Sequence, residues 1–151
     1  MWWTYFLMPG SDLLHVHRER SFFFGYFHIV TFGSIVATGA GLHAAAYYIE
    51  HHSKLGSIET VLAVAVPVAA YIVSIYVLYA WLMRTVDPFH LLLLVLTAAV
   101  LGIAVWLAAS GISMANCLLV VTLAPMVTVV GYETLGHRHA AADLARSLGL
   151  D

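Results

Sequence analysis

The sequence has very little charge. Asp, Glu, Lys and Arg make up 9% of the 151 residues, whereas a soluble domain has about 25%, and 62% of the residues are hydrophobic. The mean hydropathy is +0.92. The formal net charge is −2 and no run of basic residues occurs, so we expect no nucleic acid as a partner. This composition excludes a soluble globular domain and is typical of an integral membrane protein.

Cysteine is equally scarce. Cys117 is the single one and lies within an apolar segment, which excludes an intrachain disulfide and a cage of cysteine ligands. No base or electropositive group lies near it in sequence, so it is not expected to act as a nucleophile. Paired catalytic carboxylates, a nucleophile elbow and a phosphate-binding loop are also missing. An enzyme is therefore the function class that the sequence supports least, and we predict no catalytic residues and no cofactor.

Apolar segments make up most of the chain. Residues 22–49 contain no charged residue, and as a helix they would reach roughly 42 Å, beyond the ~30 Å hydrocarbon thickness of a bilayer. We predict an all-α integral membrane protein with a four-transmembrane-helix bundle over residues 21–135, its spans at about 22–49, 60–83, 89–109 and 112–135. Ser110 and Gly111 alone separate the last two spans, which predicts an antiparallel hairpin.

The two ends of the chain have different characters. Residues 1–20 begin with the aromatic segment WWTYF, from Trp2 to Phe6, and continue into a polar connector. The aromatic segment predicts either an anchor at the headgroup boundary or the end of a helix that starts further upstream. No positively charged leader precedes it, so we expect no cleavable signal peptide. In the tail, 136–151, Leu144 and Leu148 favour a short amphipathic helix on the membrane surface.

Lys and Arg are divided unequally between the two predicted sides of the membrane. The loop at residues 50–59 carries Lys54, whereas the connectors and tail of the other side carry five arginines. The positive-inside rule then predicts a bacterial cytoplasmic (inner) membrane protein with both termini in the cytoplasm. The five arginines are Arg18, Arg20, Arg84, Arg138 and Arg146.

The first span has a feature that a plain anchor lacks. Small residues recur every four positions, on a ridge that lets a neighbouring helix approach closely, and we therefore predict that this helix is central in the bundle. Pro67 and Pro125 occupy mid-span positions in the second and fourth spans and predict kinks there. The helix-packing ridge consists of Gly33, Ala37, Gly41 and Ala45.

Ionisable residues within the spans form a candidate polar site. His28, His43 and Glu133 are such residues, because these groups are costly in lipid and usually face a bundle interior or water. They leave open a small self-associating transporter or a proton or solute pathway. His28 and His43, about 22 Å apart along one helix, could also ligate haem, which is a weaker alternative. The second span has no histidine to complete such a site and His90 falls at the cytoplasmic edge, so we predict no haem and no metal.

Three local patterns resemble the bacterial low temperature requirement A family of multi-pass membrane proteins. They are the WWTYF segment, the aromatic pair before His28 that follows a polar connector, and GAGLHAA at residues 39–45. The resemblance covers nearly the whole chain. It covers only the carboxy-terminal portion of the family pattern, because typical members have further helices before the tryptophan pair. It implies a membrane protein of unassigned molecular activity that belongs to a larger assembly. Its partners would be the lipid bilayer and other membrane subunits, or further copies through self-association.

Overall fold

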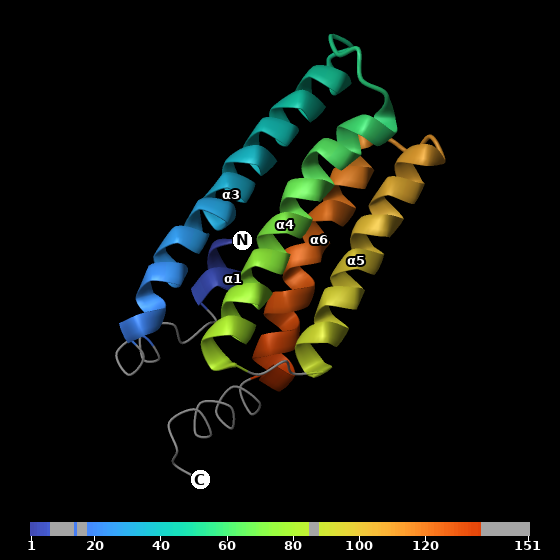
Figure 1. The fold of residues 1–151 in the computed structure, drawn as a ribbon. Helices are drawn as coiled ribbons and strands as arrows, with labels where there is room; N and C mark the ends of the chain where they lie inside the picture. The colour runs from blue at the N-terminus through green and yellow to red at the C-terminus, as the bar shows by residue number, and fades with distance from the viewer. Residues whose placement is uncertain (7–13, 15–17, 85–87, 137–151) are drawn as a thin grey trace.

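The structure is a computed structural model that describes residues 1–6, 14, 18–84 and 88–136 (Figure 1). Its elements are α1 (Trp2–Phe6), the 3-10 turn η1 (Arg18–Arg20), α3 (Ser21–Ile49), α4 (Ser57–Met83), α5 (Pro88–Ala109), α6 (Met114–Gly131) and the π-helical turn η2 (Tyr132–Gly136). The predicted amphipathic tail helix, with Leu144 and Leu148, lies outside the described residues, as do Arg138 and Arg146.

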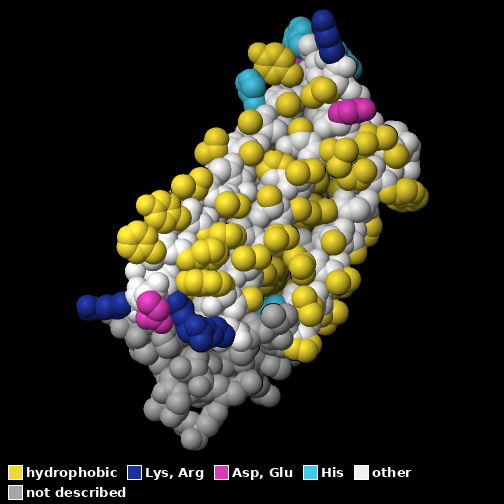
Figure 2. Space-filling model, in the orientation of Figure 1, with side chains coloured by type: hydrophobic (Ala, Val, Ile, Leu, Met, Phe, Trp, Pro, Cys, Tyr) yellow, Lys and Arg dark blue, Asp and Glu magenta, His cyan; other side chains and the backbone are white. Residues whose placement is uncertain are grey.

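Four helices of the described chain are long and apolar enough to cross a membrane. They cover Arg18–Ile49, Ser57–Met83, Pro88–Ala109 and Met114–Thr134, and they run alternately in opposite directions (Figure 1). Figure 2 shows hydrophobic side chains along the flank of the bundle and charged side chains at its two ends. The predicted all-α fold, a bundle of four transmembrane helices, is therefore confirmed.

The central helix of the bundle is α4. It packs against α3, α5 and α6. Half of the residues in its most apolar stretch of 18 are buried, whereas the corresponding share is 28% in each of the other three spans. The prediction that the first span is central is therefore wrong. Small residues indicate how closely two helices approach, but not how many neighbours a helix has. Buried hydroxyls are the better indicator, because Tyr71, Ser74 and Tyr76 of α4 need partners that lipid cannot supply.

The contact between α3 and α4 follows a line different from the predicted ridge. Gly41 and Ala45 are buried in it, whereas Gly33 and Ala37 are exposed. A spacing of four residues turns by about 40° per step around a helix of 3.6 residues per turn, so a strict ridge rotates away from a neighbouring helix. The buried line has an average period of about 3.5 residues, as two helices in prolonged contact require. It consists of Thr31, Ser34, Gly41 and Ala45.

Gly41 allows the backbones of α3 and α4 to come close together. A Cβ atom at this position would overlap the carbonyl oxygen of Ala63 and lie 2.7 Å from its carbonyl carbon. Pro67 makes that carbonyl available, because proline has no N–H to donate to the residue four positions earlier. α4 continues as a helix through Pro67, and α6 through Pro125. The α carbon of Gly41 therefore lies close to a carbonyl to which Pro67 cannot donate.

The hairpin of α5 and α6 matches the prediction. The two helices are antiparallel neighbours (Figure 1), and Gly111 in the turn has a φ of 78°, a conformation that glycine adopts without steric cost.

α1 lies within the bundle and not at the headgroup boundary. The hydroxyl of Tyr71, midway along α4, donates to the Met1 carbonyl at 2.5 Å, and Thr4 is 1% exposed. From there α1 extends between α3, α4 and α6 toward the end of the bundle that carries η1 and η2 (Figure 1). An interfacial anchor would leave these aromatic side chains to water and headgroups. In this protein the polar atoms of Trp3 and Tyr5 find partners on other helices.

Candidate functional site

α1 connects the first span to the end of the last one. The hydroxyl of Tyr5 lies 2.8 Å from Nε2 of His28 on α3, and Nε1 of Trp3 donates to Oε1 of Glu133 in η2 at 3.2 Å. Two of the three residues predicted for the polar site, His28 and Glu133, therefore each meet a side chain of α1.

The hydrogen bonds of His28 indicate the tautomer of its neutral ring. Its Nδ1 lies 2.5 Å from the carbonyl oxygen of Phe24, which can only accept, so Nδ1 carries the hydrogen. In the neutral ring Nε2 is then the acceptor for the Tyr5 hydroxyl. The rings of Phe24 and Phe32 flank the imidazole, at 4.5 and 5.5 Å between centroids. Because both ring nitrogens are engaged, a haem iron or metal ion would have to displace Tyr5 or Phe24.

His43 lies apart from this contact. It is 15 positions further along α3, about 22 Å at the helical rise, and its exposed ring packs against Tyr47 one turn away. The structure therefore does not bring His28, His43 and Glu133 into one site. Within the described part of the chain, no three His, Cys, Asp or Glu side chains gather closely enough to hold a metal ion.

A second histidine lies where α4, α5 and α6 meet. His90 is 8% exposed, and its Nε2 is hydrogen-bonded to the hydroxyl of Tyr132. Its ring lies 4.4 Å from that of Tyr79 and 5.5 Å from that of Tyr76, between centroids. The hydroxyl of Tyr76 in turn lies 3.1 Å from Oγ1 of Thr128. We call these five residues, Tyr76, Tyr79, His90, Thr128 and Tyr132, the His90 cluster.

The sequence did not predict the His90 cluster. His90 follows Pro88, the first residue of α5, so its position in the chain indicates an edge of the membrane and an exposed side chain. Neighbouring helices bury it nevertheless. The available signal was the set of tyrosines in the second span, because phenol hydroxyls inside a bundle need polar partners.

An apolar groove continues from the start of α1. It has a volume of about 420 Å³ and is lined by α3, α4 and α6. Its two threonines, Thr38 and Thr122, donate to backbone carbonyls of their own helices at 2.8 and 2.6 Å. The groove therefore offers a surface for an apolar occupant rather than groups for catalysis. Its other lining residues include Met1, Leu42, Val64, Val68, Leu118 and Pro125.

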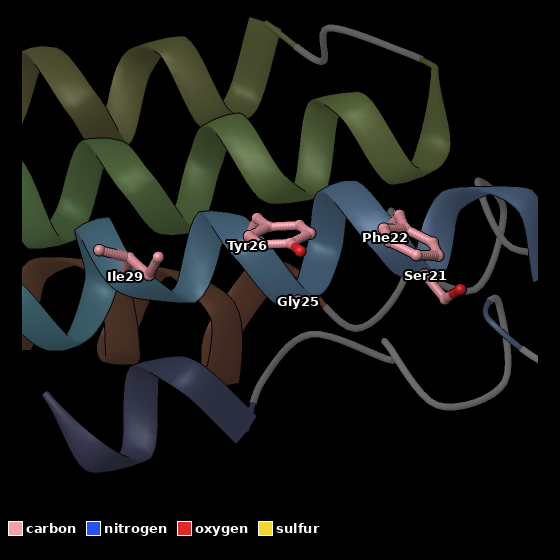
Figure 3. Close-up of a pocket in the computed structure, with 5 residues that line it drawn as sticks. All are labelled: Ser21, Phe22, Gly25, Tyr26 and Ile29. Atoms are coloured by element: carbon pink, nitrogen blue, oxygen red, sulfur yellow. The ribbon is translucent and has the colours of Figure 1, made fainter.

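A second hollow lies on the outer face of α3 (Figure 3). All five residues that line it belong to this helix, and the rings of Phe22 and Tyr26 stack above Gly25 with centroids 6.0 Å apart. Ser21 and Ile29 complete the lining. One helix alone cannot enclose a substrate, so this notch is part of the surface that the helix presents to lipid or to a partner.

A family model described as "Bacterial low temperature requirement A protein (LtrA)" matches residues 1–125. The chain belongs to the LtrA family. No curated protein and no solved structure matches it. The match confirms the resemblance that the WWTYF and GAGLHAA segments indicate, and the family description names no molecular activity. Tyr5, His28 and His90 lie inside the matched region, whereas Thr128, Tyr132 and Glu133 follow it.

The polar contacts of this LtrA-family bundle are concentrated in one half of its length. From mid-depth to the η1 and η2 end, side-chain hydrogen bonds join the helices, as at Tyr5 and His28 or at Tyr76 and Thr128. Toward the other end, the described residues have one side-chain hydrogen bond between helices. It runs from the hydroxyl of Ser57 to the Ala108 carbonyl at 3.1 Å, at the edge of the bundle. The described residues therefore form no continuous polar path from one end to the other.

Proposed function

We infer that this LtrA-family protein is one membrane-embedded part of a larger membrane assembly. The observation that carries the proposal is the short helix α1, which has five residues. It lies between α3, α4 and α6 from mid-depth toward one end, and the apolar groove continues that space toward the other end.

The depth of the bundle beyond α1 fits a helix set end to end with α1. From Thr38, which lines the groove, to Ile49 at the end of α3 is about 12 residues, or roughly 18 Å. Together with the five residues of α1, such a helix would give a span of about 17 residues, the lower limit for crossing the hydrocarbon. An apolar helix that continues from α1 therefore suits this remaining depth and the apolar lining of the groove.

Hydrogen bonding favours the same occupant. The first N–H groups of any helix have no acceptor within that helix, and those of α1 lie at mid-depth, where lipid offers none. The last carbonyl groups of a helix that abuts α1 would accept from them.

Native mass spectrometry of the protein extracted gently from its own membrane tests the assembly. We expect a complex with other chains for the natural sequence and loss of those chains in Thr122→Trp, whose indole would fill the groove. Met126→Trp is the matched control, since Met126 is exposed one turn further along α6 and does not line the groove. A lone monomer for the natural sequence would contradict the proposal, and a homo-oligomer would favour the second candidate.

That second candidate is a self-associating proton or solute pathway. It is favoured by two histidines, His28 and His90, that are each hydrogen-bonded to a tyrosine hydroxyl inside the bundle. A further copy would have to complete the path beyond mid-depth. Proton flux into vesicles with a trapped pH dye, lost in Tyr5→Phe while the fold is intact, would support it. The absence of flux for the natural sequence would oppose it. A haem role has less support, because both nitrogens of His28 are engaged, and a colourless preparation would remove it.

For the location, we infer the bacterial inner membrane with both termini in the cytoplasm. Arg18, Arg20 and Arg84 lie at one end of the bundle and Lys54 at the other, which supports this orientation through the positive-inside rule.

A further inference from the structure

A polar hollow lies at the η1 end of the bundle, between the start of α3 and the last turn of α4. It has a volume of about 400 Å³ and is lined by Glu19, Arg20, Ala80, Trp81 and Arg84. Figure 2 shows basic and acidic side chains at this end, directly beside the hydrophobic flank. The hollow therefore lies at the depth where lipid headgroups meet the hydrocarbon.

Arg20 forms the buried side of the hollow. Its side chain is 10% exposed, and its guanidinium donates to the carbonyl of Leu82 in the last turn of α4. The last carbonyls of a helix lack intrahelical donors and carry partial negative charge, which explains why a cation is stable there. Nε of Arg20 lies 3.7 Å from a carboxylate oxygen of Glu19. An arginine has five N–H donors, so these two contacts leave donors available for a ligand in the hollow.

Arg84, at the end of α4, also lines the hollow. Its φ is 53°, so the chain leaves the helix here in the left-handed conformation, and its side chain is exposed. The described lining residues therefore include two arginines and one glutamate. The resulting excess of one positive charge selects an anion.

The remaining wall of the hollow is apolar. Trp81 stacks on Phe23 of α3, with centroids 4.2 Å apart and an angle of 28° between the rings, which holds its indole in place. Ala80 extends this wall. A ligand with an anionic group beside a hydrocarbon part would meet both surfaces at once. Guanidinium groups match phosphate oxygens with paired hydrogen bonds, and Trp is favoured at this depth of the membrane.

We propose that this hollow binds a phosphate group, and that the phosphate belongs to the headgroup of an anionic phospholipid. In the orientation inferred above it is a lipid of the cytoplasmic leaflet, which carries the anionic lipids. Each arginine near such a surface contributes about 1 kcal/mol to lipid attraction, which corresponds to about a fivefold change in binding. The loss of one of the two arginines should therefore weaken lipid retention measurably without removing the helix contacts made by the other.

The test is native mass spectrometry of the full chain from nanodiscs of equimolar phosphatidylglycerol and phosphatidylcholine. We expect retained phosphatidylglycerol, and about fivefold weaker retention in Arg84→Gln. Arg18→Gln removes the same charge from the same end, and it should lower retention less than Arg84→Gln, because Arg18 does not line the hollow. Equal losses in the two variants, or no loss in Arg84→Gln, would overturn the proposal.

A second arm identifies the source of the phosphate. Inorganic phosphate at millimolar concentration should displace little phosphatidylglycerol if the lipid's acyl chains and glycerol also contribute to binding. Binding of inorganic phosphate without any retained lipid would overturn the assignment to a headgroup. Arg84→Gln is preferred over a change at Arg20, because Arg20 also binds the backbone of α4.

Discussion

At the scale of single residues, Tyr5 holds α1 to α3 through the hydrogen bond from its hydroxyl to Nε2 of His28. Hydrogen bonds between helices in a membrane contribute about 0.6 kcal/mol on average and up to about 1.7 kcal/mol, since separated helices find other partners in the membrane. A bond of this strength positions α1 without deciding whether the bundle folds.

We predict that Tyr5→Phe lowers the free energy of unfolding by about 1 kcal/mol, because the ring stays and Nε2 of His28 loses its donor. Titration with SDS, followed by tryptophan fluorescence, measures this. Tyr26→Phe is the control, since Tyr26 is exposed on the outer face of α3. Equal losses in the two variants would show that the hydroxyl of Tyr5 is not what ties α1 to α3.

A second residue-scale prediction compares two histidines. His90→Leu should lower the free energy of unfolding by about 1–3 kcal/mol, because it removes the hydrogen bond between Nε2 of His90 and the buried hydroxyl of Tyr132. His43→Leu should change it little, since His43 is exposed. The same SDS titration ranks the two variants, and a larger effect at His43 would contradict the structure.

Residue type alone predicted part of the candidate site. His28 and Glu133 could be selected because ionisable groups within spans are rare, but the same rule also selected His43, which stands apart. The partners Tyr5 and Trp3 lie 23 and 130 residues away in the chain. No local spacing encodes such pairs, because they depend on which helices become neighbours.

At the scale of elements, the contact of Gly41 with the Ala63 carbonyl fixes how closely α3 and α4 approach. We predict that Gly41→Ala destabilises the bundle by about 1–3 kcal/mol, because backbone atoms of α4 cannot move aside as a side chain can.

The matched control is Gly33→Ala on the same helix. A Cβ atom there would have nothing within 4 Å, and alanine is favoured over glycine in a helix by up to about 1 kcal/mol, so no loss is expected. Unfolding in SDS measures both variants. A larger loss at Gly33 would mean that the predicted ridge, rather than the observed line, is the contact.

Hydropathy predicted the four long helices well, because a span must hold enough consecutive apolar residues to cross the hydrocarbon. It could not predict the place of α1, which at five residues is too short to count as a span. It also gave no order of helices around the bundle. That order depends on groups such as Tyr71 and Ser74, whose partners lie on other helices.

At the scale of the whole molecule, the unequal arginines predict which side each end faces. In a Cys117→Ser background, Lys54→Cys should react with a membrane-impermeant maleimide in intact spheroplasts, because its loop faces outward. Arg18→Cys should react only after lysis. The opposite pattern of labelling would reverse the inferred orientation.

The hydrogen bond between Trp3 and Glu133 also bears on the stage of synthesis at which the bundle can finish folding. The place that α1 occupies is built in part by α6, the last of the four described spans, and the two bonded residues are 130 positions apart. At about 5–20 residues per second, α1 is made roughly 6 to 26 seconds before its binding place exists. In that interval its Trp and Tyr side chains are most stable at the membrane surface. The aromatic composition that indicates a surface anchor then suits the position of the nascent helix before α6 is made, from which it can move inward once α6 is in place.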